Sequence, residues 1–179
     1  KGDLSDLSNW RGIILLDVVA KLVSTIIARR LEDLLAVEGV ECQNAFTSRR
    51  GTPDSQFAFR RALQLRQEFG KDSWCLFVDI IKAYDQVPRD GLIMALGKLG
   101  VPPKLCRLVA AMHAGNVVNL SDTDAGVGKD ISFPYTVGVK QGDNLSPVAF
   151  IMYMQVLLES AERRWPVAKP QFVHAPRAE

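Results

Sequence analysis

The chain has 179 residues, of which 47% are hydrophobic and 23% are charged, and its net charge is only +2. This composition is that of an ordinary globular chain, the size of one domain or of one piece of a larger protein, and it excludes a low-complexity sequence. The longest apolar runs, residues 12–16 and 148–154, are too short to cross a bilayer, so we expect no membrane partner. Three scattered cysteines favour free thiols in a reducing compartment over a disulfide framework or a zinc site. We therefore expect an intracellular protein, in the nucleus or the cytoplasm.

Hydrophobic periodicity predicts the secondary structure in chain order. A helix over residues 17–37 has Asp17 as its N-cap and ends at Gly39, and a second helix covers residues 54–69. Further predicted elements are a short strand over 74–80, helices over 90–99 and 103–113, strands over 117–120 and 131–139, and a buried helix from the N-cap Ser146 to about residue 164. Because strands and helices do not alternate regularly, we predict an α+β fold with helices packed on one face of a small antiparallel sheet.

The stretch "CLFVDIIKAYDQVPRDG", residues 75–91, places Asp79 at the end of a segment that reads as a buried strand. A buried, unpaired carboxylate costs several kcal/mol, so Asp79 needs a partner. Two interpretations stay open here, a local hydrogen bond or an Mg²⁺ ion with the Ile80 carbonyl as a second oxygen ligand. Asp85 precedes Val-Pro and is interpreted as a turn former or helix cap.

The stretch "GVKQGDNLSP", residues 138–147, joins a β-like segment to a helix. Gly142 lets another backbone or a base approach closely, and the Gln141 side chain offers both a donor and an acceptor. Lys140 is either a phosphate contact or a solvated side chain. A plain strand-to-helix loop would have the same sequence.

Arginines crowd the first third of the chain. In "QNAFTSRRGTPDSQFAFR", residues 43–60, Arg49 and Arg50 lie on a loop that leads into a helix carrying Arg60. Guanidinium groups on such a loop suit triphosphate oxygens or nucleic acid, but an ordinary basic surface has the same pattern.

Taken in order, four stretches resemble the fingers and palm of a reverse transcriptase, an RNA-directed DNA polymerase of the type found in non-LTR retrotransposons and group II introns. They are "NWRGIILLDVVAKLVSTIIARRL", "QNAFTSRRGTPDS", "LFVDIIKAYDQVPRDGL" and "GVKQGDNLSPVAFIMYMQ". The resemblance covers roughly residues 5–160. It implies a fingers-like region over 1–73, a palm region over 74–165, and an irregular tail over 166–179.

The resemblance also implies roles for single residues. Asp79 is similar to the first catalytic, metal-binding aspartate, with the Ile80 carbonyl beside it, and Tyr84 to the aromatic that lies under the deoxyribose and excludes a 2′-hydroxyl. Gln141 and Gly142 resemble the pair that contacts the incoming nucleotide and the templating base pair. The basic candidates are Arg49, Arg50 and Lys21 for the nucleotide triphosphate, and Arg11, Arg60 and Lys140 for the nucleic acid. Asp143-Asn144 replaces the Cys-Pro often found in the family, a change that we expect to be tolerated.

The implied reaction is template-directed nucleotidyl transfer from a dNTP to a primer 3′-hydroxyl, with an RNA template, a DNA primer and two Mg²⁺ ions as partners. The family's second carboxylate pair, an aromatic-Ala-Asp-Asp box, does not occur in this sequence. We therefore expect a catalytically incomplete fragment that is inactive alone. Two alternatives are a non-catalytic nucleic-acid-binding remnant of a retroelement and an RNA-dependent RNA polymerase, and Tyr84 argues against the second. The sequence leaves the oligomeric state open.

Overall fold

The computed structural model describes residues 3, 5–6, 9–10, 12–40, 42–120 and 131–164. Its elements are α1 (Val18–Glu38), α2 (Thr52–Glu68), the 3₁₀ helix η2 (Ala83–Gln86), α3 (Arg89–Lys98), α4 (Pro103–His113), β1 (Val117–Leu120), β2 (Ile131–Pro134) and α5 (Leu145–Arg164). Strands β1 and β2 pair antiparallel, with Val117 opposite Pro134. The predicted mixture of helices with a small antiparallel sheet is confirmed.

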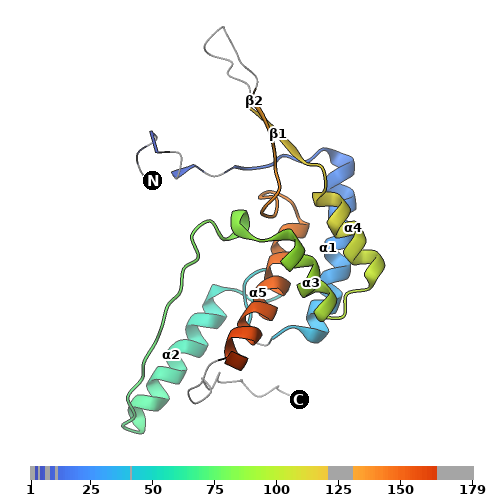
Figure 1. The fold of residues 1–179 in the computed structure, drawn as a ribbon. Helices are drawn as coiled ribbons and strands as arrows, with labels where there is room; N and C mark the ends of the chain where they lie inside the picture. The colour runs from blue at the N-terminus through green and yellow to red at the C-terminus, as the bar shows by residue number, and fades with distance from the viewer. Residues whose placement is uncertain are drawn as a thin grey trace.

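The core lies where α5 packs against α1 and α3, and where α3 packs against α4. Leu31 of α1, Leu96 of α3 and Met152 of α5 are fully buried there. The predicted burial of the first half of the last helix is confirmed. Figure 1 shows β1 and β2 projecting from this group of helices, and all four β2 side chains are exposed. Among the described residues, the helices therefore pack on one another and not, as predicted, on one face of the sheet.

Helix α1 forms as predicted, but it buries less of its apolar surface than its periodicity indicates. Asp17 caps it, since its Oδ1 accepts a hydrogen bond of 2.8 Å from the Ala20 N–H. Val18 and Leu22 stay exposed, and the buried stripe consists of Ser24, Ile27, Ala28 and Leu31. The apolar face of α1 is thus wider than the strip that α5 covers. No helix in the described part of the chain is long and apolar enough to span a membrane.

Helix α2 and the extended segment after it lie apart from the core. Helix α2 has no buried residue, and Figure 1 shows it beside the long green trace that leads to η2. It begins two residues earlier than predicted, because the Asp54 carboxylate accepts a 2.7 Å hydrogen bond from the Gly51 N–H in a capping box. Phe59 of α2 contacts Phe77 edge to face, with ring centroids 5.7 Å apart.

The predicted strand over residues 74–80 is wrong. The segment is extended but pairs with no strand among the described residues, where the sheet consists of β1 and β2. Its side chains are exposed, including Trp74 at 96% and Val78 at 76%. The aromatic and β-branched sequence is typical of a strand, but a strand exists only where a neighbour supplies the hydrogen-bonding edge.

Met152 and Met94 provide a matched test of this core. Met152→Ala is expected to lower the free energy of unfolding by about 2–5 kcal/mol, because it opens a cavity between tightly packed helices. Met94→Ala, on α3, removes the same atoms from a side chain that is 71% exposed, and we expect a change within about 0.5 kcal/mol. Urea unfolding of both variants checks this, and equal effects would contradict the described core.

Candidate functional site

The structure brings the segment around η2 against the start of the "GVKQG" motif. The Val139 N–H donates to the Tyr84 carbonyl, and the Gly138 N–H to the Val87 carbonyl, both at 2.9 Å. Gly138 has φ +88°, and a Cβ there would lie 2.9 Å from the Asp85 carbonyl oxygen. Only a glycine allows this close approach. Strand β2 ends at Pro134 and does not continue to residue 139 as predicted, and residues 138 and 139 bond to the segment around η2 instead.

Side chains reinforce this pairing of backbones. The Gln141 amide donates through Nε2 to Asp85 Oδ1 at 2.9 Å, and both residues are half-buried. Asp85, interpreted from the sequence as a turn former, thus also holds a residue 56 positions further along the chain. Its partner could not be read from the sequence, because the local pattern around Asp85 is fully explained by a turn.

Gly142 admits the backbone of another segment of the chain. The Ile14 N–H donates to the Gln141 carbonyl at 2.7 Å. Gly142 has φ +102°, and a Cβ there would lie 2.6 Å from the Ile14 carbonyl oxygen. Of the two interpretations of this glycine, close approach of a backbone is therefore observed, and the role of Gly142 in contacting a base pair stays a prediction.

Asp143 and Asn144 tie the motif to α1. Asp143 is buried, and its Oδ1 accepts hydrogen bonds from the Ser24 hydroxyl and, at 3.1 Å, from the Leu145 N–H. Asn144 donates to Thr25 Oγ1 at 2.7 Å. Helix α5 begins at Leu145, so the N-cap predicted at Ser146 is wrong, and the Asp143 carboxylate serves the first turn instead. Asp143 and Asn144 thus hydrogen-bond to Ser24 and Thr25, two adjacent residues of α1. These contacts join segments far apart in the sequence, so only the folded structure reveals them.

One of the predicted nucleotide-binding residues, Gly142, lines a hollow of about 490 Å³. Three of the four motifs contribute to its wall: Thr25 and Arg29 from α1, Phe46 from the basic loop, and Gly142 together with Pro147 from the "GVKQGDNLSP" stretch. Segments that are far apart in the sequence therefore meet at one concave surface. The lining holds one guanidinium group and one aromatic ring together with two carboxylates, those of Glu32 and Asp143. It therefore offers both charged groups and a ring to a ligand.

The Tyr84 ring is held against α5. The ring stacks on Phe150 of α5 at a centroid distance of 4.8 Å and an interplanar angle of 15°. Burial raises the pKa of the Tyr84 phenol above its ordinary value, so the side chain stays neutral at physiological pH. A neutral ring that is packed on one face can act as a steric wall.

Asp79 is exposed, so the expectation that it is buried and needs a partner is wrong. It lies on the extended segment before η2, next to the exposed Ile80. Within the described residues its carboxylate has no hydrogen bond or ion pair, and no group of three His, Cys, Asp or Glu side chains there could hold a metal. Its role as a metal ligand stays a prediction, as does that of the Ile80 carbonyl.

The basic candidates occupy different environments. Lys21, Arg49 and Arg60 are exposed on α1, the basic loop and α2. The Arg50 guanidinium donates to the Gln43 carbonyl at 3.4 Å, within the same loop. Arg11 lies outside the described residues. The assignment of these residues to triphosphate or nucleic acid stays a prediction.

Lys140 and Arg89 are turned toward the end of α4. Lys140 Nζ donates to the Met112 carbonyl at 3.0 Å, and Arg89 donates to the His113 carbonyl at 2.6 Å and to the Gly138 carbonyl at 3.2 Å. Two cations thus meet the carbonyl end of the α4 dipole, where positive charge is stabilising. Lys140 is half-buried in this position, and its assignment to nucleic acid stays a prediction.

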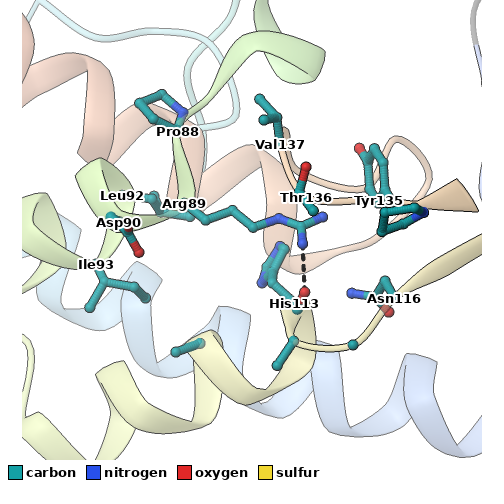
Figure 2. Close-up of a pocket in the computed structure, with 14 residues that line it drawn as sticks. Pro88, Arg89, Asp90, Leu92, Ile93, His113, Asn116, Tyr135, Thr136 and Val137 are labelled. Atoms are coloured by element: carbon teal, nitrogen blue, oxygen red, sulfur yellow. Dashed lines mark hydrogen bonds between the residues drawn. The ribbon is translucent and has the colours of Figure 1, made fainter.

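Figure 2 shows Arg89 crossing a pocket of about 490 Å³ toward His113 and Tyr135. Its guanidinium carbon lies 4.7 Å from the centre of the Tyr135 ring. Burial lowers the pKa of His113, whose Nδ1 is 2.9 Å from the Val109 carbonyl, so the imidazole is neutral at pH 7. Arg89 carried no functional signal in the sequence, yet it joins α3, α4 and the Gly138 turn.

Comparison with known proteins decides the family. Residues 1–175 match the sequence model of the family described as reverse transcriptase (RNA-dependent DNA polymerase). The chain belongs to this family. The resemblance found in the sequence motifs is thereby confirmed. Reverse transcriptases generally use divalent metals and act on a nucleic acid template with a primer.

Similar proteins come from retrotransposons. The chain is 29% identical to the "Retrovirus-related Pol polyprotein from type-1 retrotransposable element R2" of Popillia japonica, over 90% of this chain and 22% of that protein. It is 27% identical to the "Probable RNA-directed DNA polymerase from transposon BS" of Drosophila melanogaster, over 81% of this chain and 16% of that protein. It is 31% identical to the "Transposon TX1 uncharacterized 149 kDa protein" of Xenopus laevis, over 64% of this chain and 9% of that protein. The chain thus spans about a fifth or less of these relatives.

Gly142→Ala is expected to lower the free energy of unfolding by at least about 1 kcal/mol, because a methyl group at φ +102° is strained and meets the Ile14 carbonyl. Gly97→Ala is the matched control, since a Cβ there has no neighbour within 4 Å. Alanine is more stable than glycine within a helix such as α3 by about 0.5–1 kcal/mol, so this variant should not be destabilised. Urea unfolding compares the two variants. A Gly142→Ala variant as stable as the wild type would refute the close approach of Ile14.

Proposed function

We propose that the chain is the fingers and palm part of an RNA-directed DNA polymerase of a non-LTR retroelement, with fingers over residues 1–73 and palm over 74–165. The complete enzyme transfers a nucleotidyl group from a dNTP to a primer 3′-hydroxyl and copies an RNA template. The observation that carries this proposal is the hollow at which α1, the basic loop and the segment after Gln141 meet. Membership of the reverse transcriptase family supports it.

The proposed roles of single residues are those that the family resemblance implies. Gln141 and Gly142 contact the incoming nucleotide and its base pair, and Tyr84 excludes a ribose 2′-hydroxyl. The stacking of Tyr84 on Phe150 supports the second role, because a ring that cannot yield rejects an extra hydroxyl by steric overlap. Arg49, Arg50 and Lys21 are proposed to neutralise the triphosphate, and Arg11, Arg60 and Lys140 to bind the template and primer.

The residues present fit Mg²⁺ in kind but not in number. The Asp79 carboxylate and the Ile80 carbonyl are hard oxygen donors of the type that Mg²⁺ prefers. Two ions about 4 Å apart need further carboxylates, and the described residues hold no cluster of that kind. We therefore propose that Asp79 holds Mg²⁺ only together with carboxylates outside the described residues, and that the 179-residue chain alone does not extend a primer.

Asp79→Asn in the full-length protein that contains this chain tests the metal assignment. Primer extension is expected to fall by about a thousandfold or more, because several kcal/mol of charge stabilisation are lost, while template binding persists. Asp72→Asn, an exposed aspartate on the same extended segment, is the control and should leave extension unchanged. Appreciable extension by Asp79→Asn would refute the metal role. A wild-type protein that binds RNA but extends no primer would favour a non-catalytic nucleic-acid-binding remnant.

Tyr84→Ala is expected to raise the incorporation of ribonucleotides relative to deoxyribonucleotides at least about tenfold, because a steric wall of more than 1.4 kcal/mol is removed. Tyr84→Phe keeps the ring and its stacking on Phe150, and should keep the wild-type preference. Single-nucleotide extension with matched dNTP and rNTP measures the ratio. An unchanged preference in Tyr84→Ala would remove Tyr84 from this role.

A further inference from the structure

The side chain of Gln141 is held at one end by Asp85. Gln141 Nε2 donates to Asp85 Oδ1 at 2.9 Å, in a half-buried environment where competition from water is reduced. A hydrogen bond to a carboxylate is stronger than one between neutral groups. The bond joins η2 to the "GVKQG" motif.

The backbones that carry the two side chains are themselves fixed. The Gln141 carbonyl accepts from the Ile14 N–H, the Val139 N–H donates to the Tyr84 carbonyl, and the Asp85 N–H donates to the Lys82 carbonyl. Only the side-chain torsions of Asp85 and Gln141 remain to be ordered when their bond forms. The bond therefore sets the direction of the amide at a small loss of conformational entropy.

The chemistry of a carboxylate decides which end of the amide faces Asp85. An ionised carboxylate only accepts hydrogen bonds, whereas the amide has a donor end and an acceptor end. Gln141 must therefore turn its nitrogen to Asp85, which leaves Oε1 and one N–H for another partner. Within the described part of the chain, Oε1 has no hydrogen-bond partner.

We propose that Asp85 is a positioning residue, which fixes the orientation of the Gln141 amide so that Oε1 accepts a hydrogen bond from a donor group of the incoming nucleotide. This inference rests on the proposed function, because it takes the partner of Gln141 to be that nucleotide. It gives Asp85 a role in nucleotide affinity that its place in a turn does not require.

A double-mutant cycle in the full-length protein tests the proposal. Asp85→Ala, Gln141→Ala and the double variant are compared in primer extension, with KM for the dNTP and kcat measured separately on one primer–template. Asp85→Ala and Gln141→Ala are each expected to raise KM for the dNTP about fivefold to tenfold, the loss of one charge-assisted hydrogen bond. The double variant should show no further rise, because Asp85 acts through Gln141.

Two further variants separate orientation from folding. Asp85→Asn keeps the shape of the side chain but lets the amide of Gln141 turn either end toward it, so KM should lie between the wild-type and Asp85→Ala values. Asp90→Asn, on an exposed residue of α3, is the matched control and should leave KM and kcat unchanged. The urea midpoint of each variant shows whether it is folded under the assay conditions.

The possible failures are distinguishable. If Asp85→Ala raises KM as much in the Gln141→Ala background as in the wild type, or if it lowers only the active fraction with KM unchanged, Asp85 is purely structural and the inference is overturned. A wild-type protein without template-directed DNA synthesis overturns the proposed function and this inference with it.

Discussion

The close approach of residues 84–87 to residues 138–139 is the constraint on which the candidate site depends. Two backbone hydrogen bonds join the segments, and they form only because Gly138 carries no Cβ against the Asp85 carbonyl. This contact sets the positions of Tyr84 and of the chain leading to Gln141. The site is thus built on main-chain pairing, with Val87 and Val139 buried in the core behind it.

Around this pairing, polar side chains form hydrogen bonds between elements that are far apart in the sequence. Asp85 binds Gln141, Asp143 binds Ser24, and Arg89 joins the Gly138 turn to the end of α4. These groups are buried or half-buried, where a satisfied hydrogen bond fixes geometry and an unsatisfied one destabilises the fold. Such a network holds the "GVKQGDNLSP" stretch in one conformation, which is what a preorganised nucleotide site requires.

The candidate site has two parts, the Gln141-Gly142 segment and Asp79, and the described residues fix the position of the first part only. Gln141 and Gly142 lie in a network anchored to α1, η2 and α4, whereas Asp79 lies on an extended, exposed segment with an unpaired edge. An unpaired, apolar strand edge is a ready template for pairing with another strand. The proposed metal ligand is therefore in a segment whose final position depends on a hydrogen-bonding neighbour.

The sequence by itself determined most of the helices, because capping residues and a 3.6-residue apolar period are local signals. Asp17 caps α1, and most of the first half of α5 is buried as predicted. It also determined the family, through motifs whose order is specific. Tertiary structure decided which segments pair with each other, because local sequence patterns carry no information about distant partners. Residues 74–80 have a strand's composition but no partner, and Asp79 is therefore exposed. Asp85 and Asp143 gained their roles from partners on distant segments, since a hydrogen bond depends on where both of its ends are placed.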